Sequence, residues 1–245
     1  MRAEALPNLD EMTILCIQAG NVNSGAFDPA SALCRAARQA GAWAHVDGAF
    51  GLWVSAAPQR AYLAAGYDQA DSWATDAHKW LNVPYDNGLV FCRDPKYLLA
   101  AMAQLPAAYL IELEVREPMH FTPEMSRRAR GVEIWAALRS LGRSGLAEMI
   151  ERSCQHAQRF AEGLRGAGFE VLNEVVINQV LVSFGGDATT KRVIAAVKEE
   201  GTMWAGGTNW HGREAVRISV SSWATSEADV DRCVEALARV AGAVT

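Results

Sequence analysis

The sequence lacks long apolar runs and basic runs. No stretch of eighteen consecutive apolar residues occurs in its 245 residues, so it predicts no membrane-spanning helix. Residues 1–10 do not show the basic and apolar segments of a signal peptide. A net charge of −5 without a basic cluster argues against a nucleic-acid partner. We therefore expect a cytoplasmic protein that binds neither membranes nor nucleic acid.

Cysteine is also scarce. The five cysteines are Cys16, Cys34, Cys92, Cys154 and Cys233, an odd number scattered through apolar contexts. Disulfide frameworks and metal sites do not have this pattern, so we expect reduced core residues and no metal. Half of the residues are hydrophobic and 21% are charged. This composition is typical of a globular protein with a large core and one or two domains.

Only four lysines accompany nineteen arginines, and one of the four occupies an unusual place. Lys79 ends a mostly apolar, strand-like segment, where solubility does not explain a lysine. Thirty-two residues earlier, Asp47 ends a second apolar run and is followed by small residues, which let a flat ligand approach. The ends of parallel strands are where open sheets present ligands.

Together, Asp47 and Lys79 suggest a pyridoxal phosphate site. A lysine amine must be neutral to condense with the cofactor aldehyde, which requires partial burial and cationic neighbours. An acidic partner must keep the pyridine nitrogen protonated, because the charged ring accepts electrons from the substrate. The ordinary alternatives are a surface lysine and a turn aspartate, since Asp-Gly is a frequent turn dipeptide.

Six motifs occur in a fixed order along the chain: residues 45–49, 71–72, 76–80, 84–88, 127–131 and 217–221. This ordered set resembles the pyridoxal-dependent decarboxylases that include aromatic amino acid, glutamate and diaminobutyrate decarboxylases. The resemblance implies an α/β fold: part of the large domain of an aspartate aminotransferase-like (fold-type I) transferase with a mostly parallel sheet, plus a small α+β C-terminal domain. We expect residues 1–143, with a connecting helix, to belong to the large domain, and residues 144–245 to form the small one.

The resemblance also implies individual site residues. They are Lys79 and His78 for catalysis, and Lys79, Asp47, Ala49, His78, Ser72 and Asp76 for binding the cofactor. Ala49 would touch the ring face, and His78 would lie near the phosphate, where a hydrogen-bond donor is favoured. His78 could equally be a satisfied core histidine. The Asp76 carboxylate repels a phosphate unless it is protonated or another group bridges the two anions.

Members of the resembled family are longer, and residues 1–20 resemble the middle of such a protein. Their N-terminal half carries the turn that cradles the phosphate at a helix N-terminus and the side chain that stacks on the ring. Before Asp47 the only Gly-rich loop that could hold a phosphate is residues 20–25. Its Asn21, Asn23 and Ser24 fit a site role and an ordinary polar turn equally well. We expect an N-terminally truncated fragment, with a homodimer or a complementing N-terminal half as partner.

In the resembled family a mobile loop closes on the site and brings a tyrosine that donates a proton. The corresponding segment here is residues 104–122, and counting back from Arg127 reaches residues 117–119, which contain no tyrosine. Tyr109 lies eight residues too early, and His120 is a speculative substitute. The proton donor therefore stays open.

Short apolar runs alternate with helical periodicity, which indicates βαβ units. The sequence predicts strands at residues 13–18, 42–46, 72–75, 88–92, 169–172, 179–184 and 215–220, and helices at 29–40, 96–102, 127–141, 146–167, 189–200 and 227–240. Asp28 is the predicted N-cap of the first helix, with Pro29 at its first position. Residues 142–145 separate the two long helices.

Three further features call for partners. Arg127, Arg128 and Arg130 oppose the dipole of a helix start, which predicts acidic partners. Arg217 lies inside an apolar strand and predicts a carboxylate partner, either internal or on the substrate. Residues 204–211 form a Gly-rich, hairpin-like stretch whose tryptophans we expect in the core or in a dimer interface, with a substrate-lining role as the alternative.

The leading functional hypothesis is decarboxylation of an amino acid whose identity the sequence does not reveal. Amino transfer or cysteine desulfuration on the same fold is the second hypothesis, although desulfurases lack Trp80 and the motif at residues 84–88. A third hypothesis is a catalytically inactive remnant that serves as an interaction partner, because the phosphate turn is missing.

Overall fold

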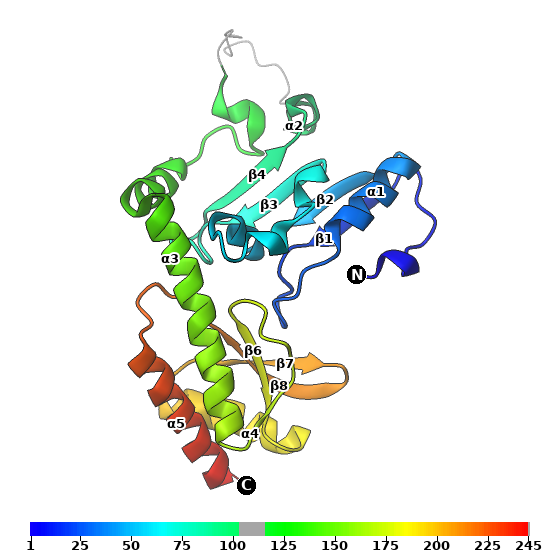
Figure 1. Cartoon of the computed structure of the whole chain (residues 1–245). Coiled ribbons are helices and arrows are strands. Elements are labelled where there is room, and N and C mark those ends of the chain that lie inside the picture. The colour runs from blue at the N-terminus through cyan, green and yellow to red at the C-terminus, as the bar shows by residue number, and fades with distance from the viewer. Residues whose placement is uncertain (103–115, 245) are drawn as a thin grey trace.

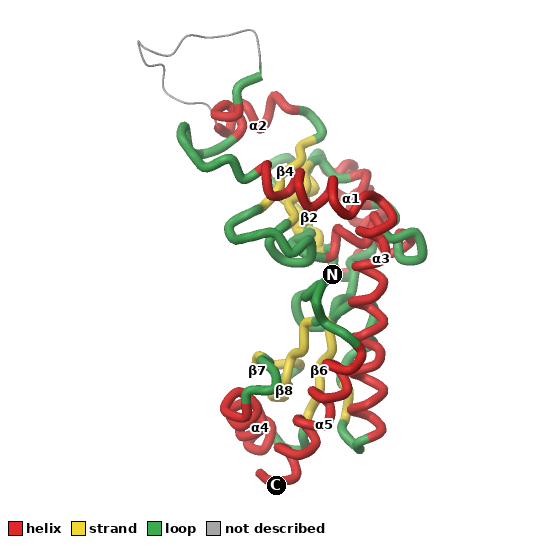
Figure 2. The backbone as a smooth tube through the Cα atoms, turned by 90° about the vertical axis from the view of Figure 1, so that its left-hand side faces the viewer, coloured by secondary structure: helices red, strands yellow, loops and turns green. Residues whose placement is uncertain are grey.

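The structure is a computed structural model that describes residues 1–102 and 116–244. Two four-stranded sheets lie towards opposite ends of the molecule, and the long helix α3 (Gly131–Gly166) runs alongside both (Figures 1 and 2). The predicted α/β fold, with a mostly parallel sheet followed by a smaller α+β unit, is confirmed. The predicted boundary between residues 143 and 144 stays a prediction.

The first sheet has the strand order β1-β2-β3-β4. Its strands are β1 (Ile14–Gln18), β2 (Trp43–Asp47), β3 (Ser72–Asp76) and β4 (Gly88–Cys92). The first three are parallel, and β4 is antiparallel to β3. Helix α1 (Ala30–Ala40) covers one face, where Leu33 packs with Ile17 and Val46 in a buried cluster. The carboxyl ends of β1, β2 and β3 therefore meet at one edge.

Three short 3-10 helices, which the sequence did not predict, connect β2 to β3. They are η2 (Gly51–Ala56), η3 (Ala61–Ala64) and η4 (Tyr67–Gln69). A Cβ on Gly51 would lie 2.2 Å from the carbonyl oxygen of Ala19. Only glycine permits this approach, which packs the loop after β2 against the end of β1.

The chain then passes through α2 (Pro95–Met102) and η5 (Pro118–Phe121) into α3. Gly142 interrupts α3 with φ 61° and ψ −173°, so the predicted break between two long helices is confirmed. The first helix begins at Gly131, four residues later than predicted. No helix in the described ranges is both long and apolar enough to cross a membrane.

The second sheet is antiparallel and has the order β5-β6-β8-β7. It comprises β5 (Glu170–Val171), β6 (Gln179–Ser183), β7 (Gly206–Trp210) and β8 (Arg213–Ser219), with helices α4 (Asp187–Glu200) and α5 (Glu227–Val244). All five residues of β6 are buried. Leu164, Val180 and Leu237 belong to one core cluster that the strands share with α3, α4 and α5. This unit has a continuous core of its own.

The predicted hairpin is β7–β8, which turns at His211 and Gly212 with φ 50° and 81°. Positive φ at both central residues gives the turn type that matches strand twist. Trp204, just before β7, is 75% exposed, so its predicted core position is wrong, and the interface and substrate-lining alternatives stay predictions.

Several other predictions need correction. Asp28 does not cap α1; its carboxylate accepts hydrogen bonds from the amide of Gln18 at 2.8 Å and from the N-terminal amine. Cys16 is exposed, whereas Cys34 and Cys154 are buried as predicted. Arg217 in β8 has no ion pair with any residue of the described ranges.

Candidate active site

The carboxyl ends of β2 and β3 lie side by side at one edge of the first sheet. Asp47, the last residue of β2, is in register with Ala74 of β3, and Asp76 ends β3 two residues later. With strands about 4.8 Å apart and a rise of about 3.3 Å per residue, the Cα atoms of Asp47 and Asp76 are about 8 Å apart. Because side chains alternate and paired residues share a face, both carboxylates point to the same face.

Backbone hydrogen bonds fix this edge. The amide of Asp76 donates to the carbonyl of Ala49 at 2.8 Å, and Asp47 Oδ1 accepts from the amide of Ala49 at 3.2 Å. A Cβ on Gly48 would lie 2.6 Å from Cβ of Leu52, so only glycine fits between them. The exposed Asp47 carboxylate and the half-buried Ala49 thus lie next to the end of β3.

Lys79 lies in the turn directly after β3. Its Nζ is 2.9 Å from Asp76 Oδ2, and the two side chains are 43% and 30% exposed. The next residue, Trp80, is fully buried and packs in the core beside α3. An ion pair this exposed contributes little to stability, so its effect is to orient the amine. The amine stays accessible on a turn that the buried tryptophan anchors.

His78 is held by two contacts that the sequence did not reveal. Its Nδ1 lies 2.8 Å from the carbonyl oxygen of Asn87, and its ring stacks on Tyr85 with centroids 4.2 Å apart. Because a carbonyl only accepts, Nδ1 carries the hydrogen, and Nε2 is left facing Asp76 Oδ2 at 3.9 Å. Asn87 and Tyr85 belong to the motif at residues 84–88. Their place in this motif of the family resemblance was the only sequence signal for them.

The predicted acidic partners of the arginines are confirmed. Arg130 donates to both carboxylate oxygens of Asp86, at 3.0 and 2.9 Å, and this pairing holds the pKa of Asp86 well below its ordinary value. Arg128 pairs with Glu133 and donates to the carbonyl of Tyr85 at 2.8 Å. The arginines therefore tie the loop that carries Tyr85 and Asp86 to the beginning of α3.

The structure does not bring Ser72 to this edge. Ser72 begins β3, and its hydroxyl is 2.8 Å from both Trp43 Nε1 and His45 Nδ1. Four residues of extended strand, about 13 Å, separate it from Asp76. The role implied for Ser72 at the cofactor phosphate has no support from this geometry.

Asn21 and Asn23 act as turn and packing residues. Asn21 Oδ1 accepts from the amides of Asn23 and Ser24 at 3.0 and 3.1 Å, and Asn23 Oδ1 accepts from Thr208 of the second sheet at 3.0 Å. The alternative of a polar turn is therefore what the structure shows. Tyr109 lies outside the described residues, and His120 is in η5, which packs against α2.

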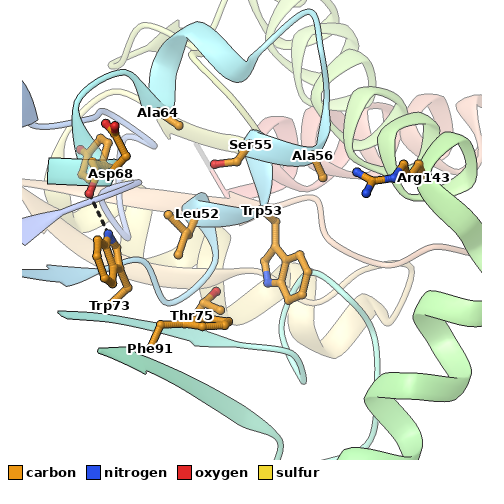
Figure 3. Close-up of a pocket in the computed structure, with 11 residues that line it drawn as sticks. Leu52, Trp53, Ser55, Ala56, Ala64, Asp68, Trp73, Thr75, Phe91 and Arg143 are labelled. Atoms are coloured by element: carbon orange, nitrogen blue, oxygen red, sulfur yellow. Dashed lines mark hydrogen bonds between the residues drawn. The ribbon is translucent and has the colours of Figure 1, made fainter. Parts of the chain in front are cut away.

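A cavity of about 660 Å³ opens on the opposite face of β3 (Figure 3). Trp53, Trp73 and Phe91 line it, and Thr75 lies at its floor with a hydroxyl that has no hydrogen-bond partner in the described part of the chain. Lys79 and Asp47 do not line this cavity. It is therefore separate from the candidate site, although Trp53 Nε1 reaches the carbonyl of Asp76 at 3.2 Å.

The residues present fit part of a pyridoxal phosphate molecule. An accessible amine at Lys79 and a carboxylate at Asp47 suit its aldehyde and its ring nitrogen. The phosphate end is not matched, because the nearby side chain is the carboxylate of Asp76. The amides of Asp76 and His78 already donate within the chain, to Ala49 and Asn87.

Comparisons with known proteins identify the family and the fold. The family model described as the pyridoxal-dependent decarboxylase conserved domain matches residues 5–185. The aromatic-L-amino-acid decarboxylase of Drosophila lebanonensis is 31% identical over 182 residues, which cover 73% of this chain and 45% of that protein. The 4-hydroxyphenylacetaldehyde synthase of Rhodiola rosea is 26% identical over 226 residues, which cover 89% of this chain and 46% of the synthase.

Solved structures share the fold. The crystal structure of Oryza sativa TDC with PLP and tryptamine superposes with a TM-score of 0.88 at 24% identity, covering 94% of this chain and 51% of that one. Mouse CSAD in its apo form gives a TM-score of 0.82 at 23% identity, covering 93% and 52%. The chain thus spans about half the length of the relatives it matches. On the family match and the shared fold, this chain belongs to the pyridoxal-dependent decarboxylase family.

Proposed function

We propose that the edge formed by β2 and β3 is the cofactor and substrate site of an amino acid decarboxylase. The observation that carries this proposal is that Asp47 and Asp76 end neighbouring parallel strands on one face, with Lys79 paired to Asp76. Parallel sheets of this kind present ligands at the carboxyl ends of their strands.

Each residue has a distinct task in the proposed reaction. When bound, pyridoxal phosphate supplies a ring that accepts the electron pair released when the substrate loses its carboxylate. Lys79 would hold the cofactor through its side-chain amine. Asp47 keeps the proton on the ring nitrogen, and His78, fixed by Asn87 and stacked on Tyr85, borders the site.

The proposed substrate is a free amino acid, and the proposed partner is a second polypeptide, either another copy of this chain or a complementing N-terminal half. We also propose a cytoplasmic location. The relatives include decarboxylases and an aldehyde synthase by name, so amine and aldehyde products both belong in any assay.

Covalent trapping tests the cofactor proposal. The purified chain is incubated with pyridoxal phosphate and reduced with borohydride, and its peptides are mapped by mass. We expect the adduct on Lys79, none at that site in Lys79→Ala, and an unchanged Lys79 adduct in Lys96→Ala, whose lysine is 67% exposed. No preference for Lys79 over the other three lysines would favour the inactive remnant instead.

A product assay separates the reactions that share this fold. The protein is incubated with a panel of amino acids, and carbon dioxide, keto acid, amine, aldehyde and sulfide are measured together. Carbon dioxide release that Lys79→Ala abolishes supports decarboxylation. Keto acid or sulfide without carbon dioxide would instead indicate amino transfer or desulfuration.

A further inference from the structure

Asn82 closes the turn that carries Lys79. It lies three residues after the lysine, and its amide donates to the carbonyl of Lys79 at 3.3 Å. The residues on either side of it, Leu81 and Val83, are buried and belong to a core cluster that includes residues of α3. Asn82 itself is only partly buried. Its side chain therefore points away from this core and is free to make other contacts.

The side chain of Asn82 joins this turn to the unit formed by the second sheet and its helices, which we call the second unit. Its Nδ2 donates to the carbonyl of Trp80 at 2.7 Å and to the carbonyl of Ser221 at 2.9 Å. Its Oδ1 accepts from the amide of Trp223 at 3.2 Å. Both donor hydrogens and the acceptor of the amide group are thus used. One side chain holds the turn after β3 and the loop after β8 together.

The loop after β8 is itself fixed to the core of the second unit. Asn178 is 1% exposed, and its Nδ2 donates to the carbonyl of Val220 at 3.0 Å. The amide of Val220 donates in turn to the carbonyl of Asn178 at 2.9 Å. Val220 also belongs to the core cluster of the second sheet. Because Ser221 is the next residue, the carbonyl that Asn82 contacts moves only with this core.

The backbone gives an ordinary explanation for an asparagine at this position. Asn82 has a positive φ of 59°, and asparagine tolerates the left-handed region better than most residues that have a side chain. That preference accounts for the turn, but not for three side-chain hydrogen bonds to two segments of the chain. Glycine tolerates the same φ without any side chain. The variant Asn82→Gly therefore separates the two explanations.

We propose that Asn82 is a positioning residue for the amine of Lys79. The ion pair with Asp76 orients the amine itself, and Asn82 fixes the backbone from which the lysine side chain extends. Through Asn82, the second unit takes part in aligning the amine with the aldehyde of the cofactor. This inference rests on the proposed function, because it takes Lys79 as the point of attachment.

Two aldehydes of different size test the proposal on the complete chain. Pyridoxal phosphate must approach Lys79 in one orientation, whereas formaldehyde needs only an accessible amine. Each adduct is trapped by reduction, and its amount on Lys79 is followed over time by peptide mass. Asn82→Gly should slow attachment of pyridoxal phosphate at least about tenfold, the effect of losing one or two net hydrogen bonds, without slowing attachment of formaldehyde. Equal slowing of both aldehydes, or slowing of neither, would overturn the proposal.

Two further variants sharpen this test. Asn82→Asp tolerates the same φ but loses both side-chain donors, so it should slow pyridoxal phosphate at least as much as Asn82→Gly. Thr208→Val is the matched control. It removes a hydrogen bond to Asn23 at 3.0 Å that also joins the two units but does not involve the turn after β3, and it should change the rate by no more than about twofold. Circular dichroism confirms that each variant is folded.

Hydrogen exchange without cofactor separates this inference from the proposed function. The amide of Trp223 donates to the Asn82 side chain, and the amide of Val83 donates to the carbonyl of Ala77 across the turn. Both amides should exchange at least about tenfold faster in Asn82→Gly than in the parent, and at the parent rate in Thr208→Val. Unchanged exchange in Asn82→Gly would overturn the positioning role. Faster exchange in a chain that does not attach pyridoxal phosphate at Lys79 would refute the proposed function and leave the link between the turn and the second unit standing.

Discussion

The two sheets differ in how completely the chain covers them. In the second, every residue of β6 is buried, and helices α3, α4 and α5 share its core. In the first, no residue of β4 is buried, and β1 alternates between exposed and buried positions. The second sheet therefore has a fully covered core, whereas the first sheet is covered only in part. The candidate active site lies on the sheet that is covered only in part.

The largest expected difference between the two sheets is in the cost of removing an apolar side chain. Leu237→Ala, at a fully buried position of α5, should lower the free energy of unfolding by about 2–5 kcal/mol. Val90→Ala, at a position of β4 that is 50% exposed, should change it by no more than about 0.5 kcal/mol. Urea denaturation measures both. Equal losses would show that the Val90 side chain is covered in solution.

The glycines give a second, smaller difference. Gly51→Ala places a Cβ against the carbonyl of Ala19 and should destabilise the first unit by about 1–3 kcal/mol. Gly242→Ala in α5 meets nothing within 4 Å and should stabilise by about 0.5–1 kcal/mol, because alanine favours helix. Thermal denaturation followed by circular dichroism measures both signs. A stabilising Gly51→Ala would contradict the close packing of the loops after β1 and β2.

Thiol reactivity measures the difference in burial between the two sheets without any substitution. Burial raises the pKa of Cys154 to about 12, so almost none of it is thiolate near pH 8, whereas Cys16 in β1 is exposed. We expect iodoacetamide to label Cys16 at least about tenfold faster than Cys154 in the native chain. Timed quenching and peptide mass analysis give the two rates, and urea should abolish the difference between them.

The smallest expected effect concerns the exposed ion pair between Arg130 and Asp86. Because the folded-state pKa of Asp86 is lowered, the pair stabilises the fold above the unfolded-state pKa of about 3.9, and this stabilisation is lost as pH falls through the folded-state value. Asp86→Asn should therefore lower the urea midpoint slightly near neutral pH, and the difference from the parent should shrink on acidification. A difference that grows towards low pH would contradict the assigned pairing.

Much of the fold followed from local pattern. The strands that end at Asp47 and Asp76 were predicted to within one residue, because each is a short apolar run bounded by small or polar residues. The break at Gly142 was predicted because two glycines, Gly142 and Gly145, separate the two helical segments. The partners of Arg128 and Arg130 followed from electrostatics, since positive charge at a helix start needs compensation.

The misses have physical reasons. Asp28 looked like a cap because Asp before Pro is a good local signal, but a tertiary contact with Gln18 uses its carboxylate instead. Ser72 was assigned to the site by motif order, and the structure places it at the opposite end of β3 from Asp76. Asn87 was missed because its backbone carbonyl, not its side chain, holds His78. A contact made by a main-chain atom does not depend on the residue type, so the sequence does not predict it.

Asn87 has a mechanical consequence. Its single carbonyl oxygen receives the amides of Ala77 and His78 as well as the imidazole Nδ1 of His78, and the very next residue begins β4. A sideways shift of that outer strand would pull on all three donors together. The position of the outermost strand therefore sets the alignment of the histidine and, through the chain, of the lysine beside it. A contact made at the outer edge of β4 would therefore change the orientation of His78 without touching it.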